Sequence, residues 1–214
     1  MATRNIIRSF ALVIGLAISS VSSVFAQTLN FEAFETQGVS NPSDLDFIDI
    51  NGLIFASGDG VAISITNNSI IGDGFITSQM PTVTSIYFED KAGVLNGSPT
   101  VVDSSLGVLF QRDDNANLPG SKKLDFVMES AFKAVPPPSQ NGLDPGEYVT
   151  FLFSGTDYDS LLVALSSGQV RVGLHIQEIG KDGKDSASFI SVIPEPSAAL
   201  LACLGALALL KRRR

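Results

Sequence analysis

The chain contains one histidine, His175, and histidine is the side chain most often used as a general base in enzymes. It lies in a segment that alternates with a period of two, where Arg171, Gly173 and Gln177 share its face and aliphatic residues occupy the other. We therefore expect His175 on the solvated face of a strand. A serine triad also needs a carboxylate that orients the base, and nothing in the sequence ties His175 to one. We assign no catalytic residue and predict that the protein is not an enzyme.

Calcium is the ligand that the acidic side chains suit best. Residues 113–117 place side-chain oxygens at alternate positions, as at the start of an EF-hand loop. Leu118 and Leu124 stand where that loop needs a glycine and a bidentate acid, so an EF-hand is excluded. The alternative is an Asx-rich turn that ends at Pro119. A looser candidate calcium site consists of Asp113, Asp114 and Asn115.

The charge balance excludes another class of function. The whole chain has a net charge of −8, but residues 27–193 alone contain 8 basic and 21 acidic residues, a net charge of −13. Nucleic-acid binding requires Lys and Arg to replace the counterions of the phosphates, so we exclude nucleic acid as a partner. The single cysteine, Cys203, lies near the C-terminus. The middle of the chain therefore has no disulfide or thiolate zinc site and depends on a hydrophobic core.

Residues 1–26 have the three parts of a secretory signal peptide. Two arginines supply a positive start, residues 10–18 form an apolar run, and small residues precede a cleavage site. We predict cleavage between Ala26 and Gln27. The apolar run is shorter than the roughly 20 residues of a membrane-spanning helix. We therefore expect the Sec machinery to export the chain and signal peptidase to process it.

Residues 192–214 carry three features in a fixed order. Pro194, Glu195 and Pro196 form an extended segment, because each proline fixes φ and lacks a backbone donor. The Ala- and Leu-rich residues 198–210 favour a helix that partitions into a bilayer. Cations that follow such a helix stay on the cytoplasmic side and stop transfer. These cations are Lys211, Arg212, Arg213 and Arg214.

This order of features closely resembles the PEP-CTERM sorting signal of Gram-negative bacteria that make exopolysaccharide. The resemblance covers about the last 21 residues. It implies that residues 194–196 are recognised by an exosortase, a membrane-embedded, cysteine-dependent enzyme of transpeptidase type, which cuts near this motif. It also implies that the inner membrane holds the protein only transiently. The protein is then expected at the cell surface or outside the cell, with exopolysaccharide as a candidate partner.

The remaining part, residues 27–191, is predicted to form one acidic β domain. Period-two alternation or β-formers mark residues 28–35, 61–66, 83–89, 123–135, 147–153, 169–179 and 186–193. The longest segment, residues 123–135, is expected to be one strand with Phe126 and Phe132 on the same face. Turn residues such as those at 58–60 and 180–184 separate these segments. One solvated face per strand indicates antiparallel pairing.

One helix is predicted near residues 157–167. Thr156 or Asp157 can cap its first turn, Leu161 and Leu165 repeat at helical spacing, and Gly168 stands at the C-terminal cap. We therefore predict an all-β fold, an antiparallel two-sheet sandwich of jelly-roll type with one short helix. A signal peptide precedes this domain, and a C-terminal transmembrane helix follows it.

Three functional hypotheses follow from these observations. The first is an exported, non-enzymatic surface or matrix protein that is sorted through its C-terminal signal. The second is a module that binds calcium or carbohydrate and associates with exopolysaccharide. Tryptophan is absent, so sugar stacking would have to use one of only three tyrosines, Tyr87, Tyr148 or Tyr158. The third is a glycan-active enzyme, which requires two carboxyl groups about 5–10 Å apart.

Overall fold

The computed structural model describes residues 26–39, 41–70, 80–180 and 182–192. As predicted, the described chain is mostly antiparallel β, with few helices. The strands are β1 (Gln27–Gln37), β2 (Ile50–Ser57), β3 (Gly60–Asn67), β4 (Thr82–Asp90), β5 (Thr100–Ser104), β6 (Phe110–Arg112), β7 (Ser130–Ala134), β8 (Tyr148–Ser154), β9 (Val170–Ile179) and β10 (Asp185–Val192). The helices are the 3-10 turns η1 (Pro42–Phe47) and η2 (Ser121–Leu124) and the α-helices α1 (Pro138–Asn141) and α2 (Tyr158–Ser166).

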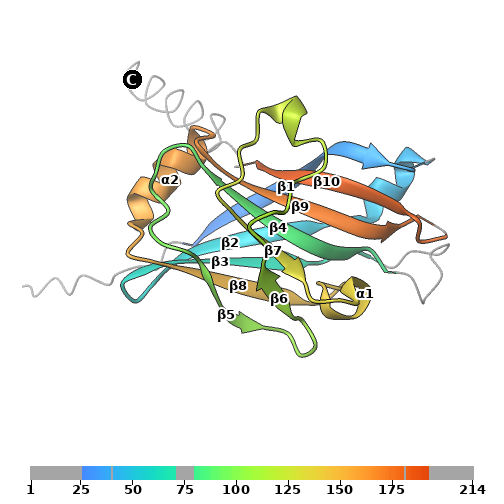
Figure 1. Cartoon of the computed structure of the whole chain (residues 1–214), viewed down its shortest axis with the longest axis horizontal. Coiled ribbons are helices and arrows are strands. Elements are labelled where there is room, and N and C mark those ends of the chain that lie inside the picture. Colours follow the sequence, from blue (N-terminus) through green and yellow to red (C-terminus); the bar gives the residue numbers. More distant parts are fainter. Residues whose placement is uncertain (1–25, 40, 71–79, 181, 193–214) are drawn as a thin grey trace, which may run out of the picture.

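Hydrogen bonds connect all ten strands in one sheet, in the order β5-β8-β3-β2-β1-β10-β9-β4-β7-β6. The expected division into two sheets of jelly-roll type is not confirmed. The two edge strands, β5 and β6, are consecutive in the chain and are joined by residues 105–109 alone (Figure 1). Such a short connection brings the two edges of the sheet close together. The sheet is therefore rolled, and we call the line where its edges meet the seam.

The apolar faces of the strands fill the inside of the rolled sheet. Phe88 of β4 packs edge-on against Phe151 and Phe153 of β8, with ring centroids 5.2 and 5.1 Å apart. Phe132 of β7 lies 4.7 Å from Phe151. Strands β4 and β8 are far apart in the hydrogen-bonded order, so these rings contact each other across the interior. The aromatic cluster thus holds the two halves of the sheet together near the seam.

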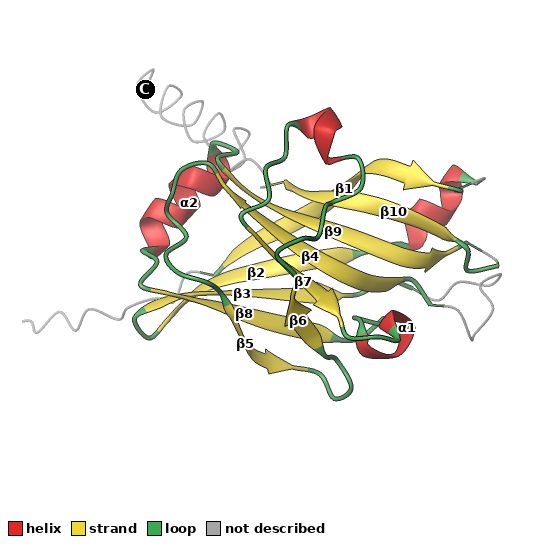
Figure 2. Ribbon diagram, viewed as in Figure 1, coloured by secondary structure: helices red, strands yellow, loops and turns green. Residues whose placement is uncertain are grey.

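Helix α2 forms as predicted and lies outside the sheet at one end (Figure 2). Asp157 is its N-cap, because its side chain accepts a hydrogen bond of 2.9 Å from the backbone N–H of Ser160. Gly168 ends the helix with a left-handed φ of 68°. Its N–H donates to the Leu165 carbonyl, and the next N–H, of Gln169, donates to Ala164. This is the paired C-terminal bonding that favours glycine.

The prediction of one long strand at residues 123–135 is wrong. Only β7 pairs with a neighbour, and the chain before it forms η2 and an irregular loop. Gly120 and Asp125 have left-handed φ angles of 76° and 47°, which break an extended conformation. We call residues 113–129 the strap, because Leu118 and Phe126 pack over Tyr87 on the outer face of the sheet. Apolar residues of the strap thus form a second, smaller core together with the outer face of the sheet.

Candidate functional site at the seam

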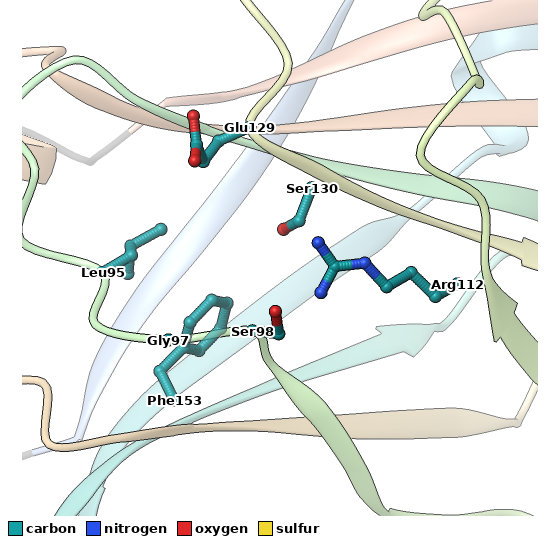
Figure 3. A pocket seen from close by; sticks show the side chains of 7 residues that line it. All are labelled: Leu95, Gly97, Ser98, Arg112, Glu129, Ser130 and Phe153. Atoms are coloured by element: carbon teal, nitrogen blue, oxygen red, sulfur yellow. The ribbon is translucent and has the colours of Figure 1, made fainter.

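A cavity of about 230 Å³ opens at the seam, between β8 on one side and β6 and β7 on the other (Figure 3). Its lining residues are Leu95, Gly97, Ser98, Arg112, Glu129, Ser130 and Phe153. In Figure 3 the guanidinium of Arg112 points between Ser98 and Ser130. Because β5 and β6 do not pair with each other, the sheet leaves this space open. We call it the seam pocket and treat it as the candidate functional site.

The loop between β4 and β5 forms one wall of the seam pocket and is held by hydrogen bonds to Asp90 and to residues 155–156. Asp90 accepts a hydrogen bond of 2.7 Å from the backbone N–H of Leu95. The backbone N–H of Asn96 donates to Thr156 Oγ1 at 3.0 Å, and its side chain donates to the Gly155 carbonyl at 2.7 Å. Thr156, considered above as a helix cap, therefore anchors this wall. These bonds keep the pocket preformed.

The opposite wall comes from β6 and from the start of β7. The Nε of Arg112 donates to Asp114 Oδ1 at 2.5 Å, which orients the guanidinium plane. Ser130 is buried and pairs with Phe88 in the register of β7 and β4. The N–H of Glu129 donates to the Phe88 carbonyl at 2.9 Å. Strand pairing of Arg112 with Phe132 thus brings Ser130 near the arginine, and Glu129 lines the pocket just before β7.

A buried ion cluster lies on the outer face of the sheet, beneath the strap. Glu89 of β4 is completely buried. Its Oε2 accepts a hydrogen bond from the Nε of Arg171 on β9, and its Oε1 accepts one of 2.6 Å from the backbone N–H of Val127. The Nζ of Lys91 lies 3.5 Å from Oε1. Buried charges need such partners, and here they attach the strap to the sheet.

His175 is half-buried, so the expectation of a solvated side chain is wrong. It lies in register between Ser85 of β4 and Ser188 of β10. The Nδ1 of His175 and the Oγ of Ser188 are both buried, and neither has a hydrogen-bond partner within the described residues. Burial lowers the pKa of His175, and the charge of Lys133 lowers it further, against a hydrogen bond to the Ala187 backbone. The protein therefore favours the neutral imidazole.

This burial predicts that stability falls as the pH is lowered below 6.5, the ordinary pKa of histidine. Below that pH the histidine of the unfolded chain binds a proton, whereas the folded state resists protonation of His175. The free energy of unfolding therefore decreases as the pH falls toward the lowered pKa of the folded state. Urea unfolding of the wild type and of a His175→Asn variant, at about pH 8 and about pH 5, measures the effect. The wild type should lose more stability than the variant. An identical pH dependence of stability in both proteins would contradict the lowered pKa of His175.

The candidate calcium residues lie in the first part of the strap, and their carboxylates already have partners. Asp113 Oδ1 accepts from the backbone N–H of Asn115 at 3.1 Å, which is the Asx turn considered above as the alternative. Asp114 bonds Arg112. No group of three or more His, Cys, Asp or Glu side chains suited to a metal occurs in the described part of the chain. The calcium site stays a prediction.

A second acidic group surrounds the turn before β8. Thr82 Oγ1 donates to Asp144 Oδ1 at 2.5 Å, and the Asp144 N–H donates to Glu147 Oε2 at 2.8 Å. Burial raises the pKa of Glu147, against the hydrogen bond from the Asp144 N–H, which lowers it. Burial also raises the pKa of Glu178, and the charge of Asp144 raises it further. None of these three acids lines the seam pocket, where Glu129 is the single carboxylate among the lining residues. The seam pocket therefore lacks the carboxylate pair of a glycosidase.

The structure describes the residues at the predicted signal cleavage site but not those of the predicted sorting signal. Ala26 is exposed, and Gln27 is the first residue of β1. The Pro194–Pro196 motif, Cys203 and the four cations at 211–214 lie outside the described residues. Among the residues that the structure describes, no helix is both long and apolar enough to span a membrane.

Comparisons with known proteins identify no relative. No family model matches the chain, and no curated protein or solved structure matches it either. The chemistry of the seam pocket is therefore argued from its own lining residues. Sequence reasoning missed it, because its lining comes from four separate segments and none of them carries a recognisable motif.

Proposed function

We propose that this chain is an exported, non-enzymatic protein of the cell surface or extracellular matrix, sorted through a PEP-CTERM signal. The observation that carries the proposal is the order of Pro194-Glu195-Pro196, the apolar run and four cations. Strand β1 begins at Gln27 and strand β10 ends at Val192, so the strands of the described domain lie between the expected processing sites. Processing at those sites would leave the rolled sheet whole.

The route follows from the chemistry of the two ends. The Sec machinery exports the chain, signal peptidase cuts after Ala26, and the apolar run holds the domain at the outer side of the inner membrane. An exosortase-like enzyme then cuts near residues 194–196 and releases the domain. The short apolar run suits a transient anchor, since about 13 residues cover only about 20 Å of a roughly 30 Å bilayer core.

Intact-mass measurement of membrane, surface and medium fractions tests this route. The surface and medium forms of the wild type should begin at Gln27 and lack residues 198–214. A variant with alanine at residues 194, 195 and 196 should stay in the membrane fraction with its tail attached. A Glu32→Ala variant, altered at an exposed acid of β1, should be processed like the wild type. If the surface form keeps the tail in the wild type, the sorting proposal is wrong.

The second hypothesis, a module that binds calcium or carbohydrate and associates with exopolysaccharide, finds less support. Asp113 and Asp114 use their carboxylates within the fold. The hydroxyl of Tyr87 donates to the Asn117 carbonyl at 3.3 Å, and that of Tyr148 donates to Asp103 at 3.1 Å. The third hypothesis, a glycan-active enzyme, lacks a carboxylate pair at the seam pocket. Both stay secondary to the sorting proposal.

A further inference from the structure

The seam pocket presents two opposite charges to one small space. We propose that it binds a small zwitterion of the α-amino-acid type, with the ligand carboxylate at Arg112 and the ligand ammonium at Glu129. The inference is independent of the sorting proposal, because it uses only residues of the rolled sheet. Either proposal can fail without the other.

Arg112 has the geometry that a carboxylate requires. Its Nε is occupied by Asp114, and within the described chain its two terminal nitrogens have no hydrogen-bond partner. A guanidinium oriented in this way can offer paired N–H groups to a carboxylate. Figure 3 shows it directed into the pocket between Ser98 and Ser130, whose hydroxyls can donate to the same ligand. The arginine wall is therefore a carboxylate site.

Glu129 supplies the opposite charge. Its backbone N–H is bonded to Phe88, but its carboxylate has no partner among the described residues. It is exposed, so a ligand can reach it. A carboxylate accepts hydrogen bonds only, and an ammonium group donates three. An ammonium next to the ligand carboxylate thus completes the interactions that Arg112 and Glu129 offer.

The local charges exclude ligands that carry only one sign. Asp114 already neutralises Arg112, so the group formed with Glu129 has a net charge of −1. A simple anion would lie beside the unpaired carboxylate of Glu129 within an acidic domain, and a simple cation would leave Arg112 without a new partner. A zwitterion adds no net charge and pairs with both Arg112 and Glu129. The balance of charge therefore selects a ligand with both signs.

The volume and the apolar lining of the pocket indicate the size of the ligand and the kind of side chain that it carries. A volume of about 230 Å³ equals about eight waters at about 30 Å³ each, which suits an amino acid rather than an oligosaccharide. Phe153 has no exposed surface and packs against Phe88, so it forms a floor and not a stacking platform for sugars. Leu95 adds a second apolar wall. A short aliphatic side chain fits this surface.

Thermal melting and calorimetry of the purified protein with L-valine and with three comparison ligands test the proposal. L-valine should raise the melting temperature in a saturable way, because a ligand that binds the folded state stabilises it. Isobutyrate lacks the ammonium and isobutylamine lacks the carboxylate, so each should bind at least about tenfold more weakly. Glucose should give no shift.

Two variants locate the site. Arg112→Gln and Glu129→Gln should each weaken L-valine binding at least about tenfold. The matched controls Lys122→Gln and Glu32→Gln change exposed charges that do not line the pocket and should bind like the wild type. The proposal is overturned if L-valine gives no saturable shift, if either one-charge analogue binds as tightly as L-valine, if glucose competes, or if the two pocket variants keep wild-type affinity.

Discussion

Replacing Glu89 by alanine should lower the free energy of unfolding by about 3–5 kcal/mol, the usual cost of removing one partner from a buried ion pair. The change removes the acceptor for Arg171 and for the backbone N–H of Val127. Arg171 would then lie in a mostly buried site without its carboxylate. Urea unfolding followed by circular dichroism measures the loss.

Limited proteolysis adds a local measurement to the same prediction. Arg171 also donates to the carbonyls of Leu124 and Asp125 at 3.1 and 3.0 Å, and its guanidinium lies 5.4 Å from the ring centre of Phe126. Loss of Glu89 should therefore loosen the strap and speed cleavage within it.

A matched control and a double variant distinguish the effect of breaking the buried ion pair from the effect of removing any charged side chain. Asp114→Ala removes one partner of the exposed pair with Arg112 and should cost at most about 1 kcal/mol. Replacing Glu89 by Gln and Arg171 by Met together should recover part of the loss, because no unpaired charge remains. If Glu89→Ala costs no more than Asp114→Ala, the cluster does not hold the strap.

Replacing Phe88 by alanine should cost about 3–5 kcal/mol, the usual range for a large aromatic residue in a core. Its ring contacts Phe132, Phe151 and Phe153, so the change opens a cavity where the two halves of the sheet meet. Phe153 also forms the floor of the seam pocket, so the pocket should lose its shape. Urea unfolding measures the loss of stability, and L-valine binding measures the loss of the site.

Leu106 is the control for this change, because its side chain is fully exposed on the loop between the edge strands. Leu106→Ala should alter stability by less than about 0.5 kcal/mol. Comparable losses from Phe88→Ala and Leu106→Ala would mean that the aromatic cluster does not join the two halves of the sheet.

Most strand positions could be predicted from the sequence, because alternation with a period of two is a local pattern. Strands β1, β3, β4, β8, β9 and β10 and helix α2 all form where this pattern or the helix caps predicted them. Strands β2, β5 and β6 were missed. The last two are short edge strands with exposed apolar side chains such as Val102, so they lack the contrast between two faces that marks a strand.

The candidate site was beyond sequence reasoning for a different reason. Arg112 directly precedes the strap and Glu129 ends it, and the pairing of β6 with β7 brings the two ends of the strap to one pocket. Nothing local marks Glu89 and Arg171 as a buried pair either, since both occupy polar positions of alternating strands. A charge at such a position indicates a solvated face unless another segment covers it.

The amino-acid sequence is enough to predict the all-β class of the domain, its acidic charge, its helix and the two end segments on which the sorting proposal depends. These features follow from composition and from patterns over neighbouring residues. The pairing of all the described strands in one rolled sheet, the attachment of the strap to Glu89 and the pocket at the seam are visible in the tertiary structure alone. These features depend on which strands pair across long distances in the sequence. The free energy of such pairing comes from contacts between distant segments, and no pattern of neighbouring residues reveals it.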